Sequence, residues 1–142
     1  SVSSSVGSVM VPAGAENGIG IISSNYFKDP ADPVWANDKG FLEYKAWLEK
    51  NMPGANIVEG FYVSGYIHAA ATAQVIRQAG DDLTRANIMK QAANLKNFEN
   101  GMLLPGIKLN TSATDFYPVE NKQLMKWNGK SWEMFGEIYG PK

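Results

Sequence analysis

The sequence of 142 residues contains no cysteine and a single histidine, His68. Without cysteine there are no disulfide bonds, no thiolate nucleophile and no cysteine-ligated zinc, so a transition-metal site would have to rely on carboxylates. His68 lies among alanines, where we expect a packed or surface side chain and not a ligand. The lack of cysteine fits both a reducing cytosol and an exported bacterial protein without disulfides, and it leaves the compartment open.

Positive charge is also scarce, with only two arginines, Arg77 and Arg85, and a formal net charge of -1. The chain therefore lacks the positive electrostatic field that attracts nucleic acids or anionic membranes. No apolar run approaches the roughly 20 residues of a membrane span. Residues 1–18 have no basic segment followed by an apolar one, so they are not expected to be a signal peptide. A chain that begins with Ser1 is expected to be a processed or truncated product.

Motifs for catalysis, metals or cofactors are not evident. A serine, His68 and Asp115 could be combined into a triad on paper, but no nucleophile elbow supports it. Gly18-Ile19-Gly20 lacks the third glycine of a dinucleotide fingerprint. Prolines 30 and 33 break any calcium-loop spacing of the nearby aspartates. We therefore expect no catalytic residue, no metal and no cofactor, and an enzyme is the weakest functional hypothesis.

The chain is organised around the stretch 60–80, which we expect to form one buried helix. Gly80 stands where a glycine closes a helix, and Arg77 places a cation in the last turn. The middle of the helix carries a face of small residues, which favours close approach of another backbone: Gly65, Ala69, Thr72 and Ala73. Its first turn, Phe61-Tyr62-Val63, is aromatic and apolar where most helices have a polar cap, so we expect apolar contacts there, either with the core or with a ligand.

Other elements follow from local patterns. Asp32 and Pro33 predict the start of a helix over 34–51 with a buried stripe of Phe41, Tyr44 and Leu48. Thr84 is expected to cap a helix that carries apolar residues up to Leu95. A short helix capped by Ser5 precedes a strand at Ile19–Ile22, whose lack of alternation is typical of strands covered on both faces. This mixture indicates an α/β fold.

The C-terminal residues predict a β-hairpin with Asn128-Gly129 as a two-residue turn. This register pairs Trp127 with Lys130, Met125 with Trp132 and Gln123 with Met134. It places Met125, Trp127, Trp132 and Met134 on one covered face. The helices nevertheless outnumber the strands that could support them, so we expect the exposed faces of helices 34–51 and 60–79 to associate with further chain or with a second copy.

The order of several segments resembles a known family. The segments are KDPADP at 28–33, WLEKNMPG at 47–54, GYIHAAATAQVIRQAG at 65–80, LTRANIMKQAANLKN at 83–97, LLPGIKLNTSATDFYP at 103–118 and QLMKWNGKSWEMFGEIYG at 123–140. Together they resemble the C-terminal part of the type I periplasmic substrate-binding proteins of branched-chain-amino-acid-type ABC transporters. The resemblance covers nearly the whole chain, but the N-terminal portion of a usual member, more than half of its length, has no counterpart here.

The resemblance implies parts of two lobes with parallel-sheet cores and a C-terminal β-hairpin. Residues 1–24 and 119–142 would belong to the second lobe, residues 34–107 to the first, and residues 25–33 and 108–118 would be crossovers. Hinge motion is expected at Phe27, Lys28 and Asp29 and at Asn110 and Thr111. Ligand contacts are implied at Tyr62, Val63, Ser3 and Ser4, where packing or capping is the alternative.

The implied function is capture of an amino acid or a small organic, possibly aromatic, acid between two lobes, for uptake through a membrane permease. The alternative is a ligand-sensing domain of a regulator or receptor with the same fold. A periplasmic or extracellular location is implied. The expected partners are the small molecule, the permease and the remaining chain or a second copy, and nucleic acid is not among them.

Overall fold

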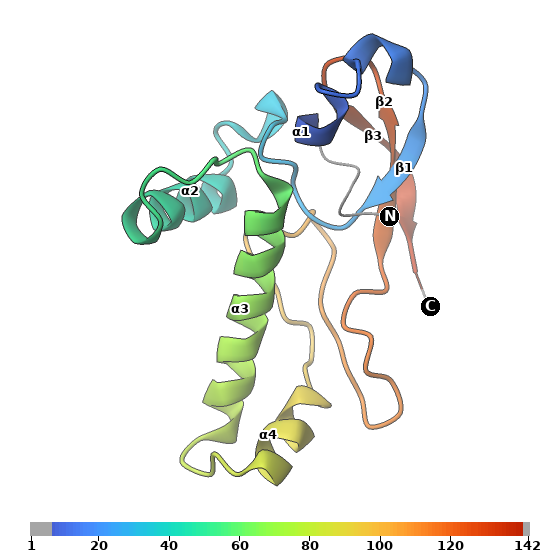
Figure 1. Cartoon of the computed structure of the whole chain (residues 1–142). Coiled ribbons are helices and arrows are strands. Elements are labelled where there is room, and N and C mark those ends of the chain that lie inside the picture. Colours follow the sequence, from blue (N-terminus) through green and yellow to red (C-terminus); the bar gives the residue numbers. More distant parts are fainter. Residues whose placement is uncertain (1–6, 141–142) are drawn as a thin grey trace.

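The computed structural model describes residues 7–140, which divide into a region built on a sheet and a region built on helices (Figure 1). The sheet region comprises residues 7–25 and 122–140, and the helical region comprises residues 32–111. The sheet region holds α1 (Gly7–Met10), the 3-10 helix η2 (Ala15–Gly18), β1 (Ile22–Asn25), β2 (Lys122–Trp127) and β3 (Trp132–Tyr139). The helical region holds the 3-10 helix η3 (Pro33–Trp35), α2 (Lys39–Asn51), α3 (Gly60–Ala79) and α4 (Arg85–Ala92). The α/β class predicted from the sequence is confirmed.

The three strands form one antiparallel sheet in the order β1-β2-β3. The strand expected at Ile19–Ile22 begins only at Ile22, whose side chain is 60% exposed, so β1 is not covered on both faces by residues 7–140. Gly20 shows why the strand starts late, because its φ of 91° turns the chain immediately before it. Parallel strand pairing is absent within this described part of the chain, where every strand pair is antiparallel.

The C-terminal hairpin is confirmed, but the predicted two-residue turn is wrong. Trp127 pairs with Trp132 and Met125 with Met134, so the loop holds four residues. Asn128 causes this, because its Oδ1 accepts hydrogen bonds from the backbone N–H groups of Lys130 and Ser131, both at 2.9 Å. The register moves by two residues, and side chains alternate with a period of two, so the covered face is the predicted one. Met125, Trp127 and Trp132 are buried there.

The helix predicted over 34–51 is divided. Asp32 does cap a helical turn, since its side chain accepts from the N–H of Val34, but the turn is the 3-10 helix η3. Asp38 then caps α2, accepting from the N–H of Phe41 at 2.9 Å. Asp38 therefore starts a new helix at Lys39, after η3 has ended at Trp35. Tyr44 and Leu48 are buried as expected, and Phe41 is half-buried.

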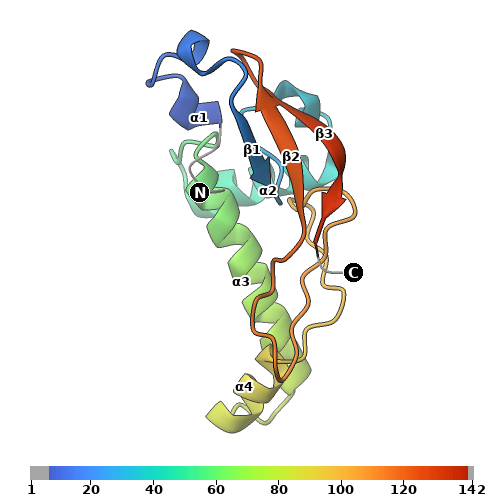
Figure 2. The same ribbon diagram turned by 90° about the vertical axis from the view of Figure 1, so that its right-hand side faces the viewer.

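Helix α3 has the predicted bounds and is followed by Gly80 with a φ of 61°. The expectation that the helix is buried was wrong for most of its surface within residues 7–140, because only one face is covered. Its buried face, which includes Val63 and Ile67, meets the chain that returns from α4 (Figure 2). The expected close backbone contact at the small-residue face is not made by residues 7–140, because no atom lies within 4 Å of a Cβ built at Gly65. None of the helices in this described part combines the length and apolar character needed to cross a membrane.

Helix α4 is capped by Thr84, as predicted, but it ends at Ala92. Leu95 therefore lies beyond the helix, where it is buried. The described residues form two apolar cores, and Met134 of β3 packs against both. The larger core belongs to the helical region and consists of Phe27, Tyr44, Leu48, Val63, Ile67, Met102, Leu103, Leu104, Ile107 and Leu109. The smaller core lies beneath the hairpin and consists of Met125, Trp127 and Trp132.

Candidate functional site

The first connection between the two regions, residues 25–33, is held by backbone pairing. Phe27 forms an antiparallel bridge with Leu103. The N–H of Lys28 donates to the carbonyl of Met102 at 2.8 Å, and the N–H of Leu104 donates to Tyr26 at 3.0 Å. Phe27 is fully buried. The segment predicted as a hinge therefore runs through the larger core and not over its surface.

Lys28 joins this connection to the helical region. Its Nζ lies 2.6 Å from Oδ1 of Asp38, the capping residue of α2, and 5.2 Å from the centre of the Trp35 ring. Desolvation raises the pKa of Asp38, but the hydrogen bonds from Lys28 and from the Phe41 amide outweigh it, so the net pKa is lowered. The Lys28 ammonium group is thus paired with the Asp38 carboxylate and lies over the Trp35 ring, at the point where the chain enters α2.

Asp29 joins the same connection to the sheet region. Its Oδ2 accepts a hydrogen bond from the N–H of Gly7 at 2.6 Å, and its Oδ1 accepts from Ala31 at 3.0 Å. Burial raises the pKa of Asp29, the two amide hydrogen bonds lower it in part, and the charge of Asp32 raises it further. Lys28 and Asp29 therefore tie one short segment to opposite regions.

The second connection holds Asn110 and Thr111. The Thr111 hydroxyl accepts from the N–H of Leu95 at 2.9 Å and donates to the carbonyl of Ala92 at 2.6 Å. The Asn110 side chain accepts from the N–H of Asn97 at 2.8 Å. These bonds fasten the start of the connection to the chain that leaves α4.

The predicted ligand residues are only partly brought together. Tyr62 is half-buried in the first turn of α3 and packs against the larger core. Val63 is fully buried, so its side chain offers no surface to a ligand in this structure. Ser3 and Ser4 lie outside the described residues.

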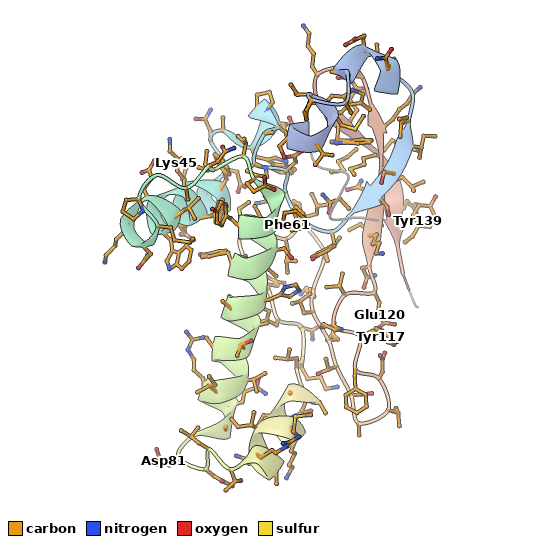
Figure 3. The ribbon with its side chains drawn as sticks, in the orientation of Figure 1. Lys45, Phe61, Asp81, Tyr117, Glu120 and Tyr139 are labelled. Atoms are coloured by element: carbon orange, nitrogen blue, oxygen red, sulfur yellow. The ribbon has the colours of Figure 1, made fainter. Side chains whose placement is uncertain are left out.

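Phe61 is an aromatic residue that was not among the predicted ligand residues. Its side chain is 66% exposed at the end of α3 that lies nearest the sheet region (Figure 3). The sequence carried a signal for it, because the aromatic first turn replaces a polar cap, and Glu59 makes no capping hydrogen bond through its side chain. Phe61 and Tyr62 together give this helix end an accessible aromatic surface.

Tyr44 lies beneath this helix end, in contact with the ring of Tyr66 at a centroid distance of 5.3 Å. Burial raises the pKa of Tyr44 to about 12, and the nearby Tyr62 hydroxyl contributes to the shift. Tyr44 therefore stays neutral at any physiological pH. Within residues 7–140, no group of three or more histidine, aspartate or glutamate side chains is arranged to hold a metal ion.

Comparison with known proteins adds one structural likeness. No protein-family model matches the chain, and no curated protein matches it. The fold is similar to that of a branched-chain amino acid ABC transporter from Thermus thermophilus, solved as a crystal structure with bound valine. The TM-score is 0.75 at 16% sequence identity, over 96% of this chain. The matched part spans only 37% of the transporter chain. The fold is therefore that of part of a periplasmic-binding-protein-type structure.

Proposed function

We propose that this chain is part of a non-catalytic solute-binding protein of an ABC transporter, which captures an amino acid or a small organic acid between two lobes. The observation that carries the proposal is the TM-score of 0.75 over 96% of the chain to a transporter structure that holds valine. The order of motifs in the sequence points to the same family independently. An extracytoplasmic location and a membrane permease as partner follow from the same proposal.

In this proposal the helical region, residues 34–107, belongs to one lobe, and residues 1–24 with the hairpin at 119–142 belong to the other. Residues 25–33 and 108–118 are two crossovers between the lobes. The bonds of Lys28 and Asp29 to opposite regions support this division, because a crossover has to be anchored at both ends. Closure is favoured when the ligand binds the closed state more tightly than the open one.

The ligand would meet the aromatic end of α3. Tyr62 supplies a half-buried ring and a hydroxyl, and Phe61 adds exposed apolar surface beside it. Ser3 and Ser4 are proposed to hydrogen-bond the polar head of the ligand. Binding sites of this kind combine mostly apolar walls with a few polar groups. An apolar or aromatic side chain on the ligand is the chemistry that this end of the helix favours.

Calorimetric titration tests the proposal with two proteins, the 142-residue chain and a polypeptide in which the rest of a two-lobed protein precedes residue 1. Valine, phenylalanine and a small organic acid serve as probes. We expect tight one-to-one binding of one of them by the longer polypeptide only, weakened more by Tyr62→Ala than by Tyr62→Phe. Tight binding by the short chain as a monomer would contradict the divided site, and no binding by the longer one would contradict the function.

A further inference from the structure

The face of α3 that is turned away from the larger core is left open by residues 7–140. Its residues form one stripe along the helix, at spacings of three and four: Phe61, Gly65, Ala69, Thr72 and Ile76. The side chains of Phe61 and Ile76 are 66% and 48% exposed, and no atom lies within 4 Å of a Cβ built at Gly65. Figure 2 shows the returning chain on the opposite side of the helix.

This stripe lacks the charges that a water-facing helix surface carries. Arg77, in the last turn, is the only lysine, arginine, aspartate or glutamate of α3. The shorter helix α2 carries such residues along its length: Lys39, Glu43, Lys45, Glu49 and Lys50. A long helix that is apolar or small on its exposed side as well is normally buried against a partner.

Thr72 does not make the stripe polar. Its hydroxyl donates to the carbonyl of His68, at 2.9 Å, and so already has a partner within the helix. Only the methyl group of Thr72 is left for a further contact. Covering Thr72 therefore creates no unpaired donor, and the stripe can be buried without the cost of one.

Opposite charges stand at the two ends of the stripe. Glu59 directly precedes α3, and its side chain makes no capping hydrogen bond. Arg77 is exposed near the other end. Neither residue takes part in an ion pair within residues 7–140. Along the helix the order is negative, large, small, large and positive, which is complementary to its own reverse. The surface that fits it is a second α3 running antiparallel.

We propose that two copies of this chain associate through α3, with the helices antiparallel about a two-fold axis close to Ala69. This axis places Phe61 of one copy beside Ile76 of the other, and Gly65 beside Thr72. The two large side chains then enclose the small ones at each end of the contact. Small residues at its centre allow the helix axes to approach to about 8–10 Å.

The same axis pairs the charges. Arg77 of each copy lies beside Glu59 of the other, and the two helix dipoles run in opposite directions, which is the favourable arrangement. Two-fold symmetry makes every such contact twice, so each substitution in the face counts twice. Phe61 also belongs to the ligand end of α3 proposed above, so dimer formation and ligand binding compete for its ring.

Sedimentation velocity of the 142-residue chain tests the proposal. One pair of helix faces is smaller than the standard interface of about 800 Å² per partner, so we expect a reversible dimer with a dissociation constant on the order of 100 µM. Concentrations on both sides of this value are measured. A monomer at every concentration would overturn the proposal and leave the face to a different partner. No ligand is present, so the result does not bear on the transporter proposal.

Charge reversal tests the antiparallel pairing. Glu59→Arg and Arg77→Glu each place like charges at both ends of the contact, and each should weaken the dimer by about tenfold. The double variant restores opposite charges, so its dissociation constant should return to that of the wild type. A double variant that dimerises no better than the single variants would contradict the pairing.

An apolar substitution locates the contact. Ile76→Ser lies far from the proposed ligand end of α3 and should weaken the dimer by about tenfold or more, because two buried side chains are lost. Met89→Ser is the matched control, since Met89 is exposed to a similar extent on α4 and lies outside the stripe. Thermal unfolding, at concentrations far below the dissociation constant, checks that both variants fold. Equal dimerisation by the two variants would exclude this face of α3.

Discussion

Nζ of Lys28 lies 2.6 Å from Oδ1 of Asp38, and the two residues stand on either side of the 3-10 helix η3. The pair closes the turn through which the chain passes from the first connection into α2. Asp38 also caps α2, so one carboxylate fixes both the connection and the start of the helix. The geometry of this turn determines how the helical region is placed relative to the sheet region.

Replacing Lys28 by methionine should lower the free energy of unfolding by about 1.5–3 kcal/mol, because a hydrogen bond between charged groups is lost in a half-buried site. The comparison is Lys45→Met, which breaks the exposed pair of Lys45 and Glu49 and should cost about 0.5 kcal/mol or less. Urea denaturation of both variants measures the difference. Equal losses would show that the Lys28 pair is no stronger than a surface pair.

The same pair predicts a dependence on acid. The pKa of Asp38 is lowered in the folded state, so its contribution to stability is complete above its ordinary pKa of 3.8. The contribution is lost as the pH falls through the lowered folded-state pKa. We expect the wild type and Lys28→Met to converge in stability below that value, which denaturation at pH 2.5 to 7 would reveal. If the difference in stability between the wild type and Lys28→Met stayed constant across this range, the pair with Asp38 would not account for the pH dependence.

The stability that Asp29 contributes should depend on pH in the opposite direction. Its pKa is raised by burial, so the stability it contributes is complete below 3.8 and falls as the pH rises through the raised folded-state pKa. Asp29→Asn cannot ionise, and we expect its stability to improve relative to the wild type over that same interval. Denaturation of the two proteins from pH 3 to 8 measures the change. A pH-independent difference would mean that Asp29 has an unperturbed pKa.

Thr111→Val should destabilise the protein by about 1–3 kcal/mol, because a buried amide and a carbonyl lose their partner while the side-chain shape is kept. The affected groups are the N–H of Leu95 and the carbonyl of Ala92. Thr114→Val, on the exposed part of the same loop, is the control. Thermal unfolding measures the melting temperature of both variants. An equal fall in the two would show that the Thr111 hydrogen bonds do not contribute to stability.

Gly40→Ala should destabilise by about 1–3 kcal/mol through overpacking, because a Cβ there would collide with the backbone of Gly101. Gly65→Ala is the matched substitution in an uncrowded helix position and should stabilise by about 0.5–1 kcal/mol. Denaturation of the 142-residue chain measures both. If Gly65→Ala is instead harmful, the small-residue face of α3 is in close contact with another chain.

Much of this structure could be predicted from local patterns in the sequence. The bounds of α3, the cap at Thr84 and the covered face of the hairpin depend on neighbouring residues and were right. The hairpin register was wrong because the Asn128 side chain bonds within the loop, an interaction that the Asn-Gly pattern does not distinguish. The helix start at 34 was wrong because a second capping residue, Asp38, competes with Asp32.

The candidate site was less predictable, because it depends on contacts between distant segments. The burial of Val63 is set by the chain that returns from α4, and no local pattern indicates that side. The anchoring of Asp29 requires Gly7, which lies 22 positions earlier.

The pairing of Ile22 with Lys126 has a consequence for synthesis on the ribosome. More than a hundred residues separate these partners, so β1 emerges long before β2 exists. The helical region can fold as it leaves the exit tunnel, because its contacts are mostly closer in sequence, whereas the sheet has to wait until β2 has been translated. During this delay β1 is an unpaired edge strand that begins at the exposed Ile22, and unpaired strand edges are sites of unwanted association.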